Sequence, residues 1–117
     1  NRRTDLIISG GENIYPKEIE DTVYAMQGVK ECAVIPVADT KWGQVPALFV
    51  AFDDIDALGA DLKMIVRDYL SSKLAKYKVP KYITIMDALP RNGTGKIMRK
   101  SLASHLDMTA SNGGSHE

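Results

Sequence analysis

Two apolar, β-rich runs, 29–37 and 45–52, constrain the fold of this chain more than any other feature. Only the loop 38–43 and one further residue separate them, so the two strands should pair antiparallel. Pro46 lacks a backbone N–H, which predicts an irregular or edge-like start to the second strand. A third β-rich run, 82–86, completes a small core sheet of three strands.

The strongest helical pattern covers 62–74, where apolar residues recur at intervals of three and four and the helix stops before Pro80. The residues of this stripe are Leu62, Ile65, Val66, Tyr69, Leu70 and Leu74. A second helix is predicted over 16–27, because Pro16 suits a first helical turn and Gly28 suits a helix C-terminus.

A β-hairpin is expected at the N-terminus, where the apolar segment 5–8 runs into the turn residues 9–13. The paired glycines Gly10 and Gly11 are typical of a tight turn between two strands. Helical spacing returns over 96–106. The predicted fold class is therefore α+β, with a small three-stranded sheet, flanking helices and an N-terminal β-hairpin.

With 117 residues and 12.9 kDa, the chain fits one small domain, which we place at 1–106, followed by a disordered tail at 107–117. Cys32 is the single cysteine, so no intrachain disulfide can form, and it is expected to be a small buried strand residue. No apolar run reaches the roughly 18 residues that a membrane helix needs. There is neither a signal peptide nor an initiator Met, so we expect a mature piece or an excised fragment.

The formal net charge of zero hides an uneven distribution. The segment 71–100 holds eight basic residues against one acidic residue, a net of +7, and the rest of the chain holds seven against fourteen, a net of −7. A basic segment favours an anionic partner, although a solvated basic face would look the same.

The run Gly93-Thr94-Gly95-Lys96 resembles only the end of a phosphate-binding P-loop, because Pro90 and Ile97 replace a glycine and a hydroxyl residue that the pattern requires. What survives is a glycine loop that presents a lysine at a helix start, or simply a solvent-exposed lysine. A metal site is not predicted: the acidic loop 54–65 lacks calcium ligands at two required positions, and His105 is the one histidine outside the tail. The carboxylates Glu18, Glu20 and Asp21 are expected to stabilise a helix N-terminus.

Aromatic and basic residues alternate around Tyr77, which lies between Lys76 and Lys78 and close to Lys81. Such interleaving suits contact with a nucleotide or nucleic acid. Trp42, in a loop, could stack on a base or pack at the edge of the core. On these residues alone both interpretations stay open.

Three segments, taken in order, resemble a known family: 2–20, the run Trp42-Gly43-Gln44, and 89–97. The family is the C-terminal domain of adenylate-forming enzymes, the AMP-binding superfamily. In order, the three segments are similar to the hinge and hairpin that open this domain, to a motif in its middle, and to the loop that carries its catalytic lysine. The resemblance covers about 2–106. The residues of these motifs most closely resemble those of the o-succinylbenzoate–CoA ligases of menaquinone synthesis, and 4-chlorobenzoate and medium-chain acyl-CoA ligases share many of them.

The resemblance implies a cytoplasmic acid–thiol ligase that works in two half-reactions. A small carboxylic acid attacks the α-phosphate of Mg2+-bound ATP to give an acyl-adenylate, and the thiol of coenzyme A then displaces AMP. The C-terminal domain swivels between the steps and presents a different face each time. Lys96 is implied to be catalytic in the first step, reaching the α-phosphate and carboxylate oxygens.

Further site residues follow from the same resemblance. Arg2 is implied to contact the nucleotide of ATP or AMP, and Thr4 and Asp5 to form the hinge. Gly10 and Gly11 should line the tunnel for the pantetheine arm of coenzyme A. The residues implied to lie near the coenzyme A nucleotide are Trp42, Tyr77, Lys78 and Lys81.

The resemblance places the ATP phosphate loop and the acyl pocket in a large N-terminal domain, which is absent from this sequence and is the implied partner. We therefore expect the chain to fold alone without ligase activity, and the acyl substrate cannot be named. An adenylation domain that loads a carrier protein is one alternative. A basic nucleic-acid-binding module is the other, although nucleic acid is not an expected partner.

Overall fold

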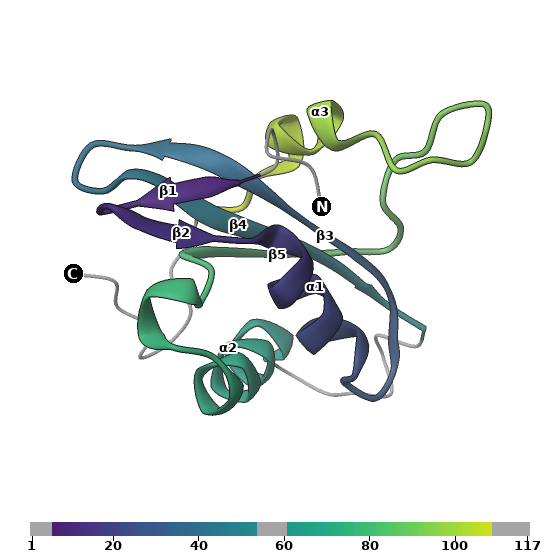
Figure 1. Cartoon of the computed structure of the whole chain (residues 1–117). Helices are drawn as coiled ribbons and strands as arrows, with labels where there is room; N and C mark the ends of the chain where they lie inside the picture. The colour runs from purple at the N-terminus through teal and green to yellow at the C-terminus, as the bar shows by residue number, and fades with distance from the viewer. Residues whose placement is uncertain (1–5, 54–60, 109–117) are drawn as a thin grey trace.

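The computed structural model describes residues 6–53 and 61–108. Within these residues the elements follow in this order (Figure 1): β1 (Ile7–Ser9), β2 (Glu12–Ile14), α1 (Pro16–Tyr24), β3 (Val29–Asp39), β4 (Gly43–Phe52), α2 (Leu62–Lys73), the 3-10 turn η3 (Lys76–Lys78), β5 (Tyr82–Met86), α3 (Arg99–Leu102) and the 3-10 turn η4 (Ala103–His105). The residues assigned to the nucleotide and the hinge, Arg2, Thr4 and Asp5, lie outside the described residues.

Strand β4 is the centre of a single sheet. It pairs antiparallel with β3 from Gly43 to Phe52 and parallel with β5 from Ala47 to Ala51, and it meets β1 where Ser9 faces Gly43. The parallel pairing of β4 and β5 needs a crossover, which α2 supplies. The predicted α+β class, with a three-stranded core and an N-terminal hairpin, is confirmed, and the hairpin joins the same sheet.

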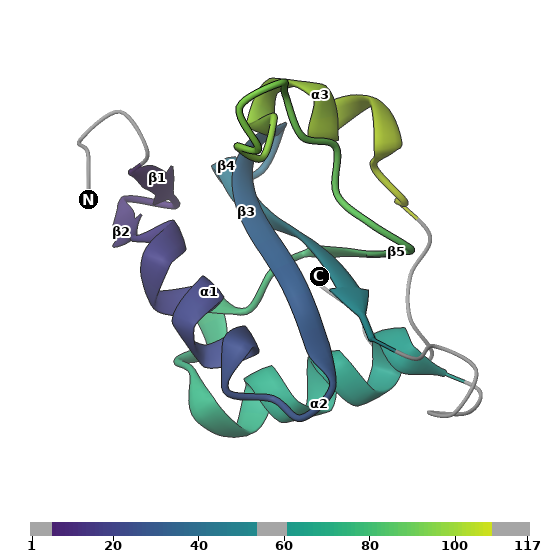
Figure 2. The same cartoon turned by 90° about the vertical axis from the view of Figure 1, so that its right-hand side faces the viewer.

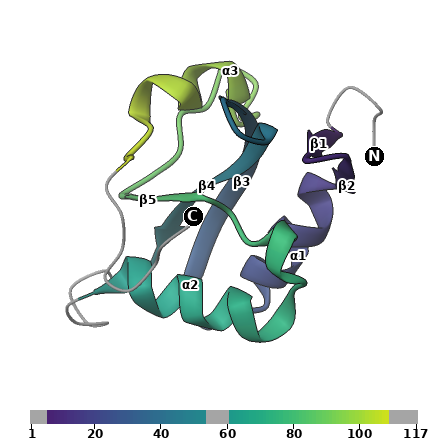
Figure 3. The same ribbon diagram turned by 90° about the vertical axis from the view of Figure 1, so that its left-hand side faces the viewer.

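Helices cover both faces of this sheet. Figure 2 shows α1 and α2 on one side and α3 on the other, and Figure 3 shows the same layers from the opposite direction. Val34, Leu48 and Val50 pack in the cluster under α1 and α2, while Phe49 packs with Leu102 under α3. Because β4 is buried on both faces, its sequence is an unbroken apolar run and does not alternate. Cys32 is buried as predicted.

Some boundaries differ from the sequence prediction. The first helix ends at Tyr24 rather than at 27, and a turn leads to Gly28. Pro46 faces Pro36 of β3, while β5 pairs with β4 only from Ala47, so the predicted edge-like start of the second strand is confirmed. The proline is tolerated because it lies between Gly43, which pairs with β1, and Ala47, where β5 begins.

The segment 96–106 is not one helix. Only Arg99–Leu102 is α-helical and Ala103–His105 is a 3-10 turn, because Ile97 forms a β-bridge with Arg91. Lys96 therefore lies in a loop and not at a helix start. Beyond this segment, the Asp107 N–H donates to Thr84 Oγ1 at 2.9 Å, and the Asp107 carboxylate pairs with Lys63 at 2.8 Å. The chain is thus held to the domain as far as Asp107.

Candidate functional site

The loop that carries Lys96 is closed at its base by backbone hydrogen bonds. The Met98 N–H donates to the Pro90 carbonyl at 2.8 Å, and the Asn92 N–H donates to the Lys96 carbonyl at 2.9 Å. Together with the Arg91–Ile97 bridge, these bonds form a short ladder. Figure 1 shows the loop extending away from the sheet at the upper right.

The tip of the loop is organised around Asn92. Its side-chain oxygen accepts hydrogen bonds from the N–H groups of Thr94 and Lys96, each at 3.0 Å, and from the Thr94 hydroxyl at 2.7 Å. Gly95 has a φ of +87°, a conformation that L residues with side chains rarely adopt. The backbone at Lys96 is therefore fixed, although every residue from Arg91 to Lys96 is exposed.

The Lys96 side chain is exposed, and its ammonium makes no hydrogen bond or ion pair within 6–53 and 61–108. Four other basic residues of the 71–100 segment bind carboxylates: Lys78, Lys81, Arg91 and Arg99. The charge excess that the sequence shows is thus partly neutralised by the fold. Lys96 is a cation held out on a defined backbone and available to an external anion.

Glu31 anchors the incoming side of this loop to β3. Its buried carboxylate accepts the Leu89 N–H at 2.8 Å and the Arg91 guanidinium, from Nε at 3.1 Å and from Nη2 at 2.5 Å. Burial raises the pKa of Glu31, but the Leu89 N–H and the Arg91 guanidinium outweigh it, and the pKa is lowered. Sequence reasoning missed Glu31, although a carboxylate at the start of an apolar strand was a visible signal.

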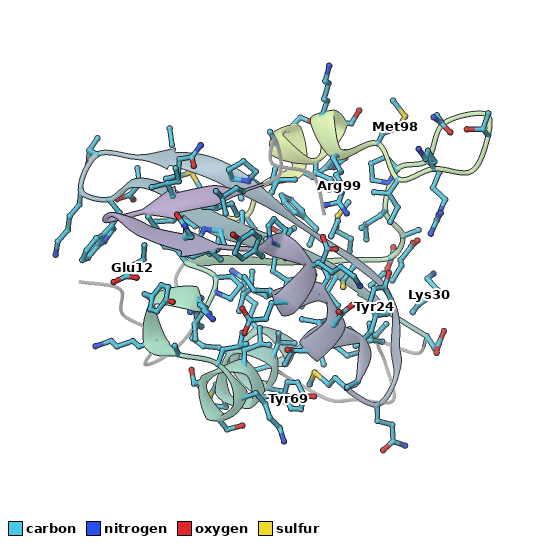
Figure 4. The ribbon with its side chains drawn as sticks, in the orientation of Figure 1. Glu12, Tyr24, Lys30, Tyr69, Met98 and Arg99 are labelled. Atoms are coloured by element: carbon cyan, nitrogen blue, oxygen red, sulfur yellow. The ribbon has the colours of Figure 1, made fainter. Side chains whose placement is uncertain are left out.

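Arg99 anchors the outgoing side. It donates to Glu20 Oε2 at 2.9 Å and to the Val34 carbonyl at 3.0 Å, while Glu20 accepts the Val34 N–H at 2.8 Å. Figure 4 places Arg99 between α3 and α1. Glu20 was assigned to a helix N-terminus, and this is wrong: its carboxylate covers the exposed edge of β3 and binds Arg99.

A second group of predicted site residues lies at the other end of the domain. The hairpin turn packs on Trp42: the Gly10 N–H donates to the Trp42 carbonyl at 2.8 Å, and a Cβ placed on Gly10 would lie 2.6 Å from Trp42 Cε3. Trp42 remains 40% exposed, so one side of its indole is available to a ligand. Gly11 has no atom within 4 Å of an added Cβ and faces open space.

The lysines at this end are engaged within the domain. Lys81 pairs with Asp39 at 2.8 Å, and this bond raises the pKa of Lys81 and lowers that of Asp39. Lys78 pairs with Glu18 at 2.9 Å, which raises the pKa of Lys78. Both lysines also lie over tyrosine rings, Lys78 over the exposed Tyr77.

Lys41 was missed from the sequence. Its ammonium lies 5.0 Å from the centroid of the Trp42 ring and forms no ion pair within the described residues. The structure thus brings together Gly10, Lys41, Trp42 and Lys81 at the hairpin end of the sheet. Lys96 lies at the opposite end: Figure 4 shows Met98, beside its loop, on the far side of the domain from Glu12 in the hairpin.

Two absences concern only the residues described. Within 6–53 and 61–108, no three side chains of His, Cys, Asp or Glu gather as a protein-only metal site would require. None of the helices in the same part of the chain is long and apolar enough to cross a membrane.

The fold and the two surfaces define a class: a small α+β domain with a lysine at one end that has no partner among the described residues, and an aromatic, cationic surface at the other end. The chain belongs to the family described as AMP-binding enzyme C-terminal domain, which matches residues 18–96. The family resemblance read from the sequence is thereby confirmed.

Individual relatives agree with the family. The chain is 56% identical over 102 residues to a 2-succinylbenzoate–CoA ligase of Lactococcus lactis subsp. lactis, covering 87% of this chain and 21% of that protein. A solved structure of o-succinylbenzoate CoA synthetase (MenE) from Bacillus subtilis, in complex with the acyl-adenylate intermediate OSB-AMP, is 40% identical, with a TM-score of 0.73 over 87% of this chain and 20% of that one. A Mycobacterium tuberculosis fatty acyl CoA synthetase has a TM-score of 0.77 at 41% identity, over 89% and 20% of the chains. The chain spans about a fifth of the length of these relatives.

Proposed function

We propose that this chain is the C-terminal domain of an ATP-dependent carboxylate–CoA ligase and supplies Lys96 to its adenylation step. The observation that carries the proposal is the exposed ammonium of Lys96, which has no partner among the described residues and stands on a loop fixed by Asn92. The names of the relatives support a CoA ligase as the whole enzyme.

In the first half-reaction a carboxylate oxygen attacks the α-phosphorus of ATP, the bond to the bridging oxygen breaks, and pyrophosphate leaves. Negative charge accumulates on the oxygens around the α-phosphorus as this happens. An aimed ammonium such as that of Lys96 stabilises this charge more strongly than the charge of the ground state. Mg2+ would neutralise the phosphates of ATP, and we assign its binding to the partner domain, where the family resemblance places the ATP phosphate loop.

In the second half-reaction the thiol of coenzyme A attacks the acyl carbon, and AMP leaves. We assign the hairpin end of the domain to this step. Gly11 faces open space, which leaves room for the pantetheine arm, while Gly10 lets the Trp42 ring pack on the turn. Trp42 with Lys41 offers a ring and a cation to the nucleotide. Lys81 must share or exchange its bond to Asp39 if it is to bind a phosphate.

The remaining nucleotide contacts are proposed for Tyr77 and Lys78, which lie together on η3. Arg2 near the nucleotide, and the hinge at Thr4 and Asp5, stay predictions from the sequence. A hinge between the two domains would let the two opposite ends of this one face the active site in turn. For the location of the whole enzyme we propose the cytoplasm, where ATP and coenzyme A are both available.

For the acyl substrate we propose 2-succinylbenzoate, which the relatives at 56% and 50% identity name, and hence a role in menaquinone synthesis. A relative at 40% identity is named a long-chain-fatty-acid–CoA ligase, so a long-chain fatty acid is the competing substrate to assay.

The test uses the full-length enzyme with Lys96→Ala. The rate of adenylate formation from 2-succinylbenzoate and ATP, measured by the release of pyrophosphate, should fall about 100- to 1,000-fold. This is the usual loss when one group that stabilises transition-state charge is removed. Thioester formation from preformed adenylate should change little. Lys100→Ala is the matched control, because Lys100 is an exposed lysine four residues away and has no assigned role. Equal losses in the two half-reactions would count against the assignment of Lys96.

The acceptor is tested in the same assay by replacing coenzyme A with a phosphopantetheinylated carrier protein.

The structure gives little support to a nucleic-acid-binding module, since four of the eight basic residues of the 71–100 segment are bound to carboxylates.

A further inference from the structure

Two arginine–carboxylate pairs hold the Lys96 loop, one at each end. Arg91, at the start of the loop, binds Glu31 of β3, and Arg99, just after it, binds Glu20 of α1. The partners are far apart in sequence, 60 residues in the first pair and 79 in the second. Each pair therefore ties the loop to a different element of the folded domain.

Arg91 also reaches the residue next to the lysine. Its Nη1 donates to the carbonyl of Gly95, while its Nε and Nη2 bind Glu31. The guanidinium is planar and presents its donors in a fixed fork, so it transmits a geometry that a flexible ammonium would not. The Arg91 side chain therefore fixes the position of Gly95, and hence of Lys96, relative to strand β3.

The two carboxylates differ from those of ordinary surface pairs. The side chains of Glu31 and Glu20 are 8% and 13% exposed, whereas that of Asp21, which pairs with Lys17, is 62% exposed. Removing a carboxylate from water is costly, and a buried pair is weak evidence for a gain in stability. A role in fixing geometry explains why two such pairs border one exposed loop.

We propose that the pairs Glu31–Arg91 and Glu20–Arg99 are positioning residues that clamp the loop, so that Lys96 is carried rigidly with the domain to the reacting phosphate. This inference rests on the proposed adenylation role of Lys96. Loosening the clamp should lower the rate of adenylate formation about 10- to 100-fold, as small misplacements of a catalytic group do. Thioester formation from preformed adenylate should be spared.

The experiment uses the full-length enzyme and the variants Glu31→Gln, Arg91→Ala and the double variant. Glu31→Gln keeps an oxygen that can accept the Leu89 N–H, so it should fold. Arg91→Ala strands a buried carboxylate and should lower the unfolding temperature, and adding Glu31→Gln should restore that temperature by removing the stranded charge. Asp21→Asn is the control, a carboxylate-to-amide change in an exposed pair.

Three measurements are made on each variant: the unfolding temperature, hydrogen exchange of the backbone amides of 92–96, and the two half-reaction rates with 2-succinylbenzoate. The clamp predicts faster exchange and slower adenylation in all three clamp variants, including the double variant with its restored stability. Asp21→Asn should change neither.

The clamp is overturned if adenylation recovers together with stability in the double variant, or if the exchange of 92–96 is unchanged by Glu31→Gln and Arg91→Ala. Failure of the proposed function has a different signature. In that case Lys96→Ala leaves adenylation intact, while the exchange of the loop still responds to the clamp variants.

Discussion

The contact between Gly10 and Trp42 makes a sharp prediction about the hairpin end of the domain. An added Cβ at Gly10 would lie 2.6 Å from Trp42 Cε3 and 3.0 Å from Cζ3, distances at which the indole must move. Gly11 is the matched control, because its φ of +84° is also in the left-handed region but no atom lies within 4 Å of an added Cβ. Comparing Gly10→Ala with Gly11→Ala therefore separates the ring contact from backbone strain.

The expected losses in the free energy of unfolding follow from the backbone strain and the ring contact. A left-handed conformation costs a residue with a Cβ about 1–2 kcal/mol, and the loss of glycine's freedom in the unfolded chain returns about 0.4–1 kcal/mol. Gly11→Ala should thus reduce the free energy of unfolding by about 1 kcal/mol. Displacing the indole adds about 1–3 kcal/mol, as overpacking does, so Gly10→Ala should cost about 2–4 kcal/mol.

The assay is urea unfolding of the 117-residue chain, with each substitution made in the wild-type sequence and in a Trp42→Ala background. In that background the ring is gone, so the two alanine variants should cost about the same. The reasoning is refuted if Gly10→Ala is no more destabilising than Gly11→Ala, or if its excess cost survives the removal of Trp42.

Two further predictions concern single titratable groups. Burial, with a smaller contribution from Glu20, raises the pKa of Cys32 to about 12, so a thiol reagent at pH 8 should leave the folded chain unmodified and label it fully in denaturant; rapid native labelling would contradict the buried thiol. The pKa of Glu31 lies below its usual 4.5, so its contribution to stability is complete above about pH 4.5 and is lost as the pH falls through the folded-state value. Glu31→Gln should therefore flatten the acid side of the stability profile, and an unchanged acid slope in that variant would refute the Glu31 ion pair.

Much of the fold could be predicted from local sequence patterns. The strand at 82–86 was located from its β-rich residues and the helix beginning at Leu62 from its apolar periodicity. The helix ends at Lys73, before Pro80 as predicted. The segment after Lys96 was misjudged because helical spacing does not reveal that Ile97 pairs with Arg91 in a β-bridge. The edge-like start at Pro46 was predicted because proline lacks the N–H that a strand paired on both sides would use, and β5 indeed pairs with β4 only from Ala47.

The residues of the candidate site also differ in how far local sequence could predict them. Lys96 and the hairpin glycines could be proposed as site residues because motifs are local in sequence. Glu31 was missed and Glu20 was given the wrong role because their partners lie 60 and 79 residues away. A carboxylate in a strand or helix looks the same in the sequence whether or not an arginine reaches it. Pairings of that kind are products of the tertiary structure.

These long-range pairs also explain how a chain with zero net charge can have a specific cationic site. The carboxylates that bind Lys78, Lys81, Arg91 and Arg99 come from the segment 18–39, so folding brings much of the acidic part onto the basic part. The pairing leaves Lys96 exposed and unpaired among the described residues. At physiological salt the Debye length is about 8 Å, and attraction between exposed charges farther apart than this is largely screened. Neutralising the neighbouring basic residues therefore weakens the contact between Lys96 and a bound anion only slightly. It does remove the broad positive field that would attract any polyanion. Recognition then depends on where the ammonium of Lys96 is held, and the two arginine pairs that border its loop are the features that determine that position.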